Sequence, residues 1–104
     1  MTRHTAPKGL RQGDVLLLPV AQVRGERLEP IDGRHILAEG EQTGHHHYIP
    51  AGPSIAVFRD KDTLFVEGNA RLFHQEHSDL PIDGTYEVVQ QRQASNGHPV
   101  VVVD

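Results

Sequence analysis

The fold is decided by residues 54–67, which read Ser54-Ile55-Ala56-Val57-Phe58-Arg59-Asp60-Lys61-Asp62-Thr63-Leu64-Phe65-Val66-Glu67. The stretch up to Arg59 is rich in β-branched and aromatic residues, and Thr63 to Glu67 has the same character. Between them, Asp60-Lys61-Asp62 has the composition of a tight turn. Two such runs joined by a short polar turn predict a β-hairpin.

The same alternation of strands and turns continues outward from this hairpin in both directions. Gly68-Asn69 is either a further turn or a bulge inside one long strand. Nothing has the spacing of an amphipathic helix. The other expected strands are 15–20, 34–41, 45–49, 70–76, 85–93 and 99–103, separated by turns at 29–33, 50–53, 80–84 and 94–98.

This pattern predicts an all-β protein, a small single-domain β-barrel or sandwich of about seven or eight short antiparallel strands. Residues 1–10 are expected to form a flexible N-terminal arm, and 11–104 a single β domain. Hydrophobic residues make up 37% and aromatic residues only 5%, with no Trp, so the core must be built from Val, Leu and Ile.

Composition also narrows the class of protein. No apolar run approaches the roughly 18 residues of a membrane span, and no secretory signal precedes the domain. The absence of cysteine fits a cytoplasmic protein. The net charge is −4, and the basic residues are scattered, which argues against nucleic acid or a membrane as partner. An acidic chain with eight histidines is better suited to binding a metal cation.

Five of the eight histidines lie in two short segments, Gly44-His45-His46-His47-Tyr48 and His74-Gln75-Glu76-His77. Residues two apart on a strand share a face at about 6.6–7 Å. His45 and His47 should therefore face one way, with His46 and Tyr48 opposite. Two imidazoles at this spacing can converge on one ion.

In the second segment, His74 and Glu76 share a face of a regular strand, and His77 points away. If the strand ends or bulges at Glu76, His77 joins His74 instead. The predicted ligands are His45, His47 and His74, with His77 or Glu76 as the fourth. The expected cofactor is a divalent transition metal: three imidazoles suit zinc, two with a carboxylate suit iron, and nickel and manganese are alternatives.

Other interpretations stay open. The histidines can be solvated side chains of a polar hairpin, and the domain an interaction module that binds through an edge strand. A small hydrolytic or oxygen-using metalloenzyme is the alternative to a structural or metal-handling domain, with no catalytic residue identified. Glu41 is a candidate acceptor for an imidazole N–H.

The remaining features concern the ends of the chain and the isolated histidines. An exposed Val100–Val103 strand would allow a homodimer, whereas burial in the same domain is the simpler outcome. His4, His35 and His98 are assigned to the surface or to turns.

The chain resembles a group of small bacterial and phage proteins of unknown activity. The resemblance spans most of residues 11–92, and it implies that His45, His47, His74 and His77 are motif histidines. It is carried by Gly13-Asp14-Val15-Leu16-Leu17, Leu37-Ala38-Glu39-Gly40-Glu41, Thr43-Gly44-His45 with His47, His74 with Glu76-His77, and Gln91-Arg92.

A second resemblance is to cupins, which place a His-x-His pair on one barrel strand and a further His on a later strand. His45, His47 and His74 are similar to that arrangement. The cupin glutamate after the pair is replaced here by Ala51-Gly52, and Pro81-Ile82-Asp83-Gly84 lacks the later cupin motif. The similarity is therefore one of geometry, and geometry alone does not carry function.

Overall fold

The computed structural model describes residues 9–39 and 44–91. Within these residues the chain forms only β-strands and connections, so the all-β prediction is confirmed. No helix in this part of the chain has the length and apolar character to cross a membrane. The strands are β1 (Leu10–Gln12), β2 (Val15–Pro19), β3 (Glu26–Arg27), β4 (Arg34–Glu39), β5 (His46–Pro50), β6 (Ile55–Asp60), β7 (Thr63–Leu72) and β8 (Leu80–Gln90).

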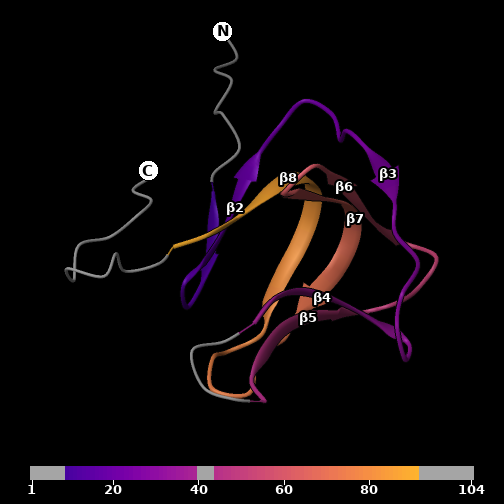
Figure 1. Ribbon diagram of the computed structural model, residues 1–104. Coiled ribbons are helices and arrows are strands. Elements are labelled where there is room, and N and C mark those ends of the chain that lie inside the picture. Colours follow the sequence, from indigo (N-terminus) through magenta and orange to yellow (C-terminus); the bar gives the residue numbers. More distant parts are fainter. Residues whose placement is uncertain (1–8, 40–43, 92–104) are drawn as a thin grey trace, which may run out of the picture.

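Six of these strands form one antiparallel sheet in the order β1-β2-β8-β7-β6-β3. β4 and β5 form a second, two-stranded sheet that crosses one end of the larger one (Figure 1). Tyr48 of β5 and Phe73, just after β7, exchange two backbone hydrogen bonds of 2.9 and 2.8 Å and so tie the sheets together. Because β1 and β3 stay at opposite edges, the sheet is open, and the architecture is sandwich-like rather than a closed barrel.

The hairpin at residues 54–67 forms as predicted. β6 and β7 pair with Asp60 opposite Thr63 and Val57 opposite Val66. Lys61 takes a positive φ of 58° in the turn between them. Of the two alternatives for Gly68-Asn69, the structure takes the long strand, because both residues lie inside β7 and pair with β8.

Two sequence predictions in this region are wrong. Residues 80–84 are not a turn but the first half of β8, with Ile82 buried opposite Ala70. β2 pairs only with residues 86–90 of β8, so Pro81 lies where one side of the strand has no β-partner, and proline is tolerated there. The strand expected at 70–76 ends at Leu72, because Leu72 meets Leu80 at the start of β8.

The core is built from Val, Leu and Ile, as the composition predicts. Its fully buried members include Val15, Leu17, Ile49, Val66 and Leu72. His35 was expected at the surface, and that prediction is wrong: the side chain is only 7% exposed. Alternation along β4 turns His35 and Leu37 inward while Ile36 faces outward.

Several sequence predictions lie outside the described residues. They concern residues 1–8 of the arm, Glu41 with the bend before His45, the turn at 94–98, the Val100–Val103 strand, His4 and His98.

Candidate metal centre

The two histidine segments meet at the junction of the two sheets. His47 lies on β5, whereas His74 and His77 lie in the connection that follows β7. The ring centroids of His47 and His74 are 4.3 Å apart, those of His74 and His77 4.6 Å, and those of His47 and His77 6.2 Å. Because β7 ends before His74, His77 joins His74, which is the second of the two arrangements that the sequence left open.

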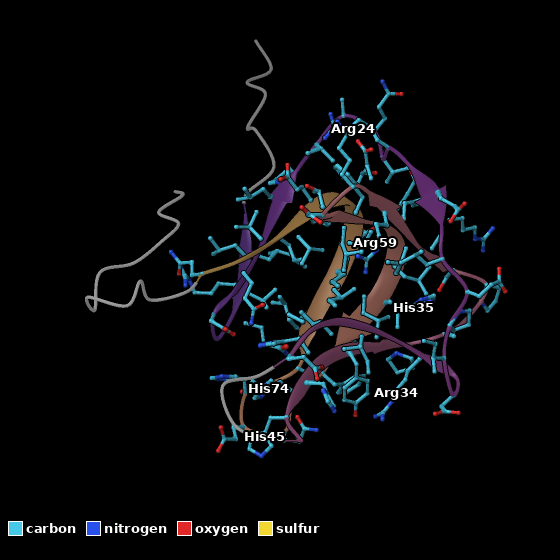
Figure 2. The ribbon with its side chains drawn as sticks, viewed as in Figure 1. Arg24, Arg34, His35, His45, Arg59 and His74 are labelled. Atoms are coloured by element: carbon cyan, nitrogen blue, oxygen red, sulfur yellow. The ribbon has the colours of Figure 1, made fainter. Side chains whose placement is uncertain are left out.

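His45 and His46 occupy the edge of this cluster. The His45 ring lies 5.7 Å from that of His74, and both are labelled in Figure 2. Its Nδ1 is buried without a hydrogen bond to any described residue, 3.4 Å from Glu76 Oε1. His46 instead has Nδ1 2.6 Å from Glu39 Oε2 and does not contribute to the group. His46 therefore points away from His47, as the alternation of side chains along a strand predicts.

The deepest histidine is held by two residues that the sequence analysis did not single out as ligands. His47 is 0% exposed. Its Nδ1 lies 2.9 Å from Gln12 Oε1, and its Nε2 lies 2.9 Å from Asp14 Oδ1. Both partners come from the β1–β2 hairpin. Gly13 and Asp14 form the two-residue turn of this hairpin. Gly13 has a φ of 58°, and a type II′ turn requires a positive φ at this first position.

The proton on His47 can be located from the hydrogen bonds of Gln12. The Gln12 amide nitrogen donates to the carbonyl oxygens of Leu72 and Ser78, at 2.8 and 2.9 Å. Its oxygen must therefore be the atom that faces His47, and an oxygen can only accept. It follows that Nδ1 of His47 carries the proton. In a neutral ring, Nε2 then directs a lone pair at Asp14.

The pKa shifts of His47 and Asp14 indicate the charge that each side chain carries at their contact. Burial lowers the pKa of His47 and outweighs the opposing effect of Asp14, so the ring is neutral near pH 7. Burial would raise the pKa of Asp14, but hydrogen bonds with Gln90 and His47 together bring it below its usual value. Nε2 of the neutral His47 ring and a carboxylate oxygen of Asp14 thus lie 2.9 Å apart, a contact in which a proton or a cation must satisfy both atoms.

The outer two histidines are not yet turned toward this contact. His74 Nδ1 accepts the N–H of Glu76 at 3.0 Å, so its neutral ring carries the proton on Nε2. Burial and the neighbouring His47, His77 and His45 lower its pKa. His77 is exposed, and its ring covers Gly13, where a Cβ would come within 2.4 Å of Nε2. Accordingly, no three His, Asp or Glu side chains in the described part of the chain form a ready metal-binding group.

The fold and the site define a small, open all-β domain with a histidine-rich junction between its two sheets. Residues 11–91 match the model of a family described as Domain of unknown function (DUF8820), and the chain belongs to that family. This membership agrees with the resemblance to small proteins of unknown activity. Comparisons with curated proteins and with solved structures found no match.

Proposed function

We propose that this domain binds one divalent transition-metal ion at the contact between His47 and Asp14, as a structural or metal-handling site. The observation that carries the proposal is the 2.9 Å approach of His47 Nε2 to Asp14 Oδ1, while Nδ1 of the same ring donates to Gln12. Two acceptor atoms this close need a proton or a metal cation between them, and the neutral ring already donates its one proton to Gln12. With metal–ligand bonds of about 2.1 Å, two ligand atoms at this separation subtend close to 90° at the ion, an ordinary angle for a divalent metal.

His74 and His77 are the nearest side chains that can complete the coordination. In a site with bonds of about 2.1 Å and angles of about 90–109°, ring centroids lie about 4.6–5.3 Å apart, and the three observed separations run from 4.3 to 6.2 Å. His77 is exposed and forms no hydrogen bond with a described residue that would have to break, whereas His74 needs to release one local hydrogen bond. His45 and Glu76 form the next ring outward, where the buried Nδ1 of His45 has no hydrogen bond to a described residue.

Gln12 supports this function by fixing the tautomer. Metal-binding histidines commonly donate their second N–H to a carbonyl-type oxygen, which orients the ring. Gln12 Oε1 takes that position for His47. Imidazole and carboxylate ligands suit zinc, iron, nickel and manganese. The ligand set therefore indicates a divalent transition metal without selecting one element.

A second candidate function is a small metal-dependent enzyme. The carboxylate of Asp14 favours it, because a site of two histidines and one carboxylate leaves coordination positions for water. A bound metal would supply Lewis acidity and a water with a pKa near 7. Asp14 is partly exposed and His77 is exposed, so solvent reaches the site from their side.

The test is metal content, measured by mass spectrometry on untagged protein purified without a chelator or a nickel column. Wild type is compared with Asp14→Asn and with His74→Ala/His77→Ala. His46→Ala is the matched control, because His46 belongs to the same segment but contacts Glu39 instead. We expect about one metal per chain in wild type and control, and a loss of at least tenfold in affinity for the other two variants.

Two results would contradict the proposal. Wild type without metal after incubation with zinc, iron(II), nickel and manganese salts excludes a site of useful affinity. Metal retained by Asp14→Asn but lost from His46→Ala would place the site on the wrong face of β5. If metal binds as expected, hydrolytic and oxygen-consuming assays with the loaded protein then separate the second candidate from the first.

A further inference from the structure

A pocket of about 220 Å³ lies away from the histidine cluster, beside the chain that follows β3. Its lining comes from three separate parts of the sequence: residues 27–30, His35 of β4, and the connection from β5 into β6. Figure 2 shows His35 beside the segment that leads from β3 to β4. The pocket shares no residue with the proposed metal site.

The unusual feature of the pocket is His35. The residue is 93% buried, since only 7% of it is exposed, and its ring makes no hydrogen bond with any residue that the structure describes. Both ring nitrogens of His35 nevertheless keep some exposed surface, and the residue lines the pocket. Removing most of an imidazole ring from water without giving it a protein partner costs folding free energy. Such a cost is typical of positions kept for a ligand.

The charges around the pocket are of both signs. Arg27 and Glu29 are exposed, lie two residues apart, and form no ion pair with each other or with other described residues. Both act on the pKa of His35, which burial lowers first and Arg27 lowers further, while Glu29 opposes them. The ring is therefore neutral and offers one N–H donor and one acceptor.

The rest of the lining is apolar and limits the size of an occupant. Leu28, Pro30, Ala51 and Ile55 supply hydrocarbon surface. The volume is below the roughly 300–1,000 Å³ of pockets for drug-sized ligands. An occupant must therefore be small and carry a negative group, a positive group and an aliphatic part.

We propose that this pocket binds a free α-amino acid with an aliphatic side chain. Arg27 and the His35 N–H contact its carboxylate, Glu29 contacts its ammonium group, and Leu28 and Ile55 contact the side chain. An anion alone would meet the charge of Glu29, and an amine alone would meet that of Arg27. Only a zwitterion is attracted by both.

The experiment is isothermal titration of the full chain with L-leucine and with its two halves, 4-methylpentanoate and 3-methylbutan-1-amine. We expect L-leucine to bind at least about tenfold tighter than either half. Arg27→Gln and Glu29→Gln should each weaken leucine binding by about tenfold. Both positions are exposed, so neither change threatens the fold. Arg59→Gln, on the neighbouring strand but outside the pocket, is the matched control and should bind as wild type.

Either half binding as well as L-leucine would overturn the zwitterion proposal, and so would no binding of leucine up to about 10 mM. A further variant, His35→Leu, gives an independent readout. It should unfold at a higher urea concentration than wild type while losing leucine affinity. If His35→Leu lowers stability and leaves leucine binding unchanged, His35 is only a packing residue and the proposal fails.

Discussion

A single proton on His47 sets the chemistry of the candidate metal site. Gln12 directs that proton to Nδ1, and the lone pair of Nε2 is then left facing Asp14. Neither partner is near His47 in the sequence: 35 residues separate His47 from Gln12 and 33 separate it from Asp14. Substitutions at these two positions test the argument without removing the buried histidine.

Asp14→Asn should raise the stability of the metal-free protein. The new amide can donate to His47 Nε2 and still accept from Gln90 through its oxygen, so the neutral ring gains a hydrogen bond without having to take up a proton. We expect the free energy of unfolding in a chelator at pH 7.5 to rise by about 1 kcal/mol. Urea denaturation measures it.

The matched control for Asp14→Asn is Glu39→Gln, at the exposed contact with His46, which should change stability by less than about 0.5 kcal/mol. A clear loss of stability in Asp14→Asn would mean that His47 is protonated and forms an ion pair with Asp14. In that case the contact would be satisfied by a proton and would not require a metal ion.

Gln12→Met should be strongly destabilising although the two side chains are similar in size. Gln12 is 3% exposed, and its removal leaves two carbonyl oxygens and the Nδ1–H of His47 without their partner. We expect a loss of about 2–4 kcal/mol in urea denaturation.

Gln75→Met is the comparison for Gln12→Met, because Gln75 also bridges two parts of the backbone, accepting from His46 and donating to Gly44. Gln75 is exposed, so water replaces its hydrogen bonds and the loss should stay below about 1 kcal/mol. Equal losses of unfolding free energy in the two variants would show that the buried hydrogen bonds of Gln12 contribute no more than exposed ones.

At the scale of elements, the structure depends on where strands bend and end. Gly68 and Gly84 face each other on β7 and β8 with φ of 135° and 143°, and the two strands curve strongly along their length (Figure 1). Ser54 approaches the Gly68 backbone so closely that no Cβ fits. The same curvature leaves residues 73–77 beyond the sheet, where His74 and His77 can reach β5.

Gly68→Ala should therefore destabilise the domain by about 3 kcal/mol, because the new Cβ would lie 2.0 Å from the carbonyl oxygen of Ser54 and the backbone must move. Gly33→Ala provides the comparison. It also has a positive φ, of 77°, but a Cβ there meets nothing within 4 Å, so only the conformational cost of about 1–2 kcal/mol applies. Urea denaturation of both variants measures the difference. Equal losses would remove steric contact as the cause.

Strand prediction succeeded where the local composition is that of a strand and failed where only pairing with a neighbouring strand extends the chain. The hairpin of β6 and β7 needs only local turn chemistry. The strand at Leu80–Gly84 was missed because Pro81, Asp83 and Gly84 have turn composition, and only pairing with β7 extends them. Strands β1 and β3 were missed because three and two residues are too few to show an alternation of apolar and polar side chains.

For the whole molecule, the lowered pKa values of His35, His47 and His74 predict a loss of stability in mild acid. Above the ordinary histidine pKa of about 6.5, both folded and unfolded chains are neutral at these sites. Below it, the unfolded chain takes up protons that the folded chain resists, so the free energy of unfolding falls with pH. The lowered pKa of Asp14 acts in a different window, below its ordinary value of 3.8.

Urea denaturation in a chelator at pH 8, 7, 6 and 5 tests this prediction. We expect little change between pH 8 and 7 and a progressive fall from 7 to 5, with a slope of at most about 1.4 kcal/mol per pH unit for each histidine. His35→Leu should reduce the slope, because it removes one of the three groups whose pKa is lowered. Stability that rises toward pH 5 would show that the buried histidines are charged in the fold.

The sequence by itself determined the strand character of the chain, the Val, Leu and Ile core, and the two segments in which five histidines lie. These follow from local alternation, turn composition and the spacing of two residues on a strand. Only the tertiary structure decided that His35 is buried, that His77 accompanies His74, and that Gln12 and Asp14 enclose His47. The physical reason is that contacts between β1, β5 and the end of β7 depend on sheet order and strand length, which long-range hydrogen bonds fix and local composition does not record.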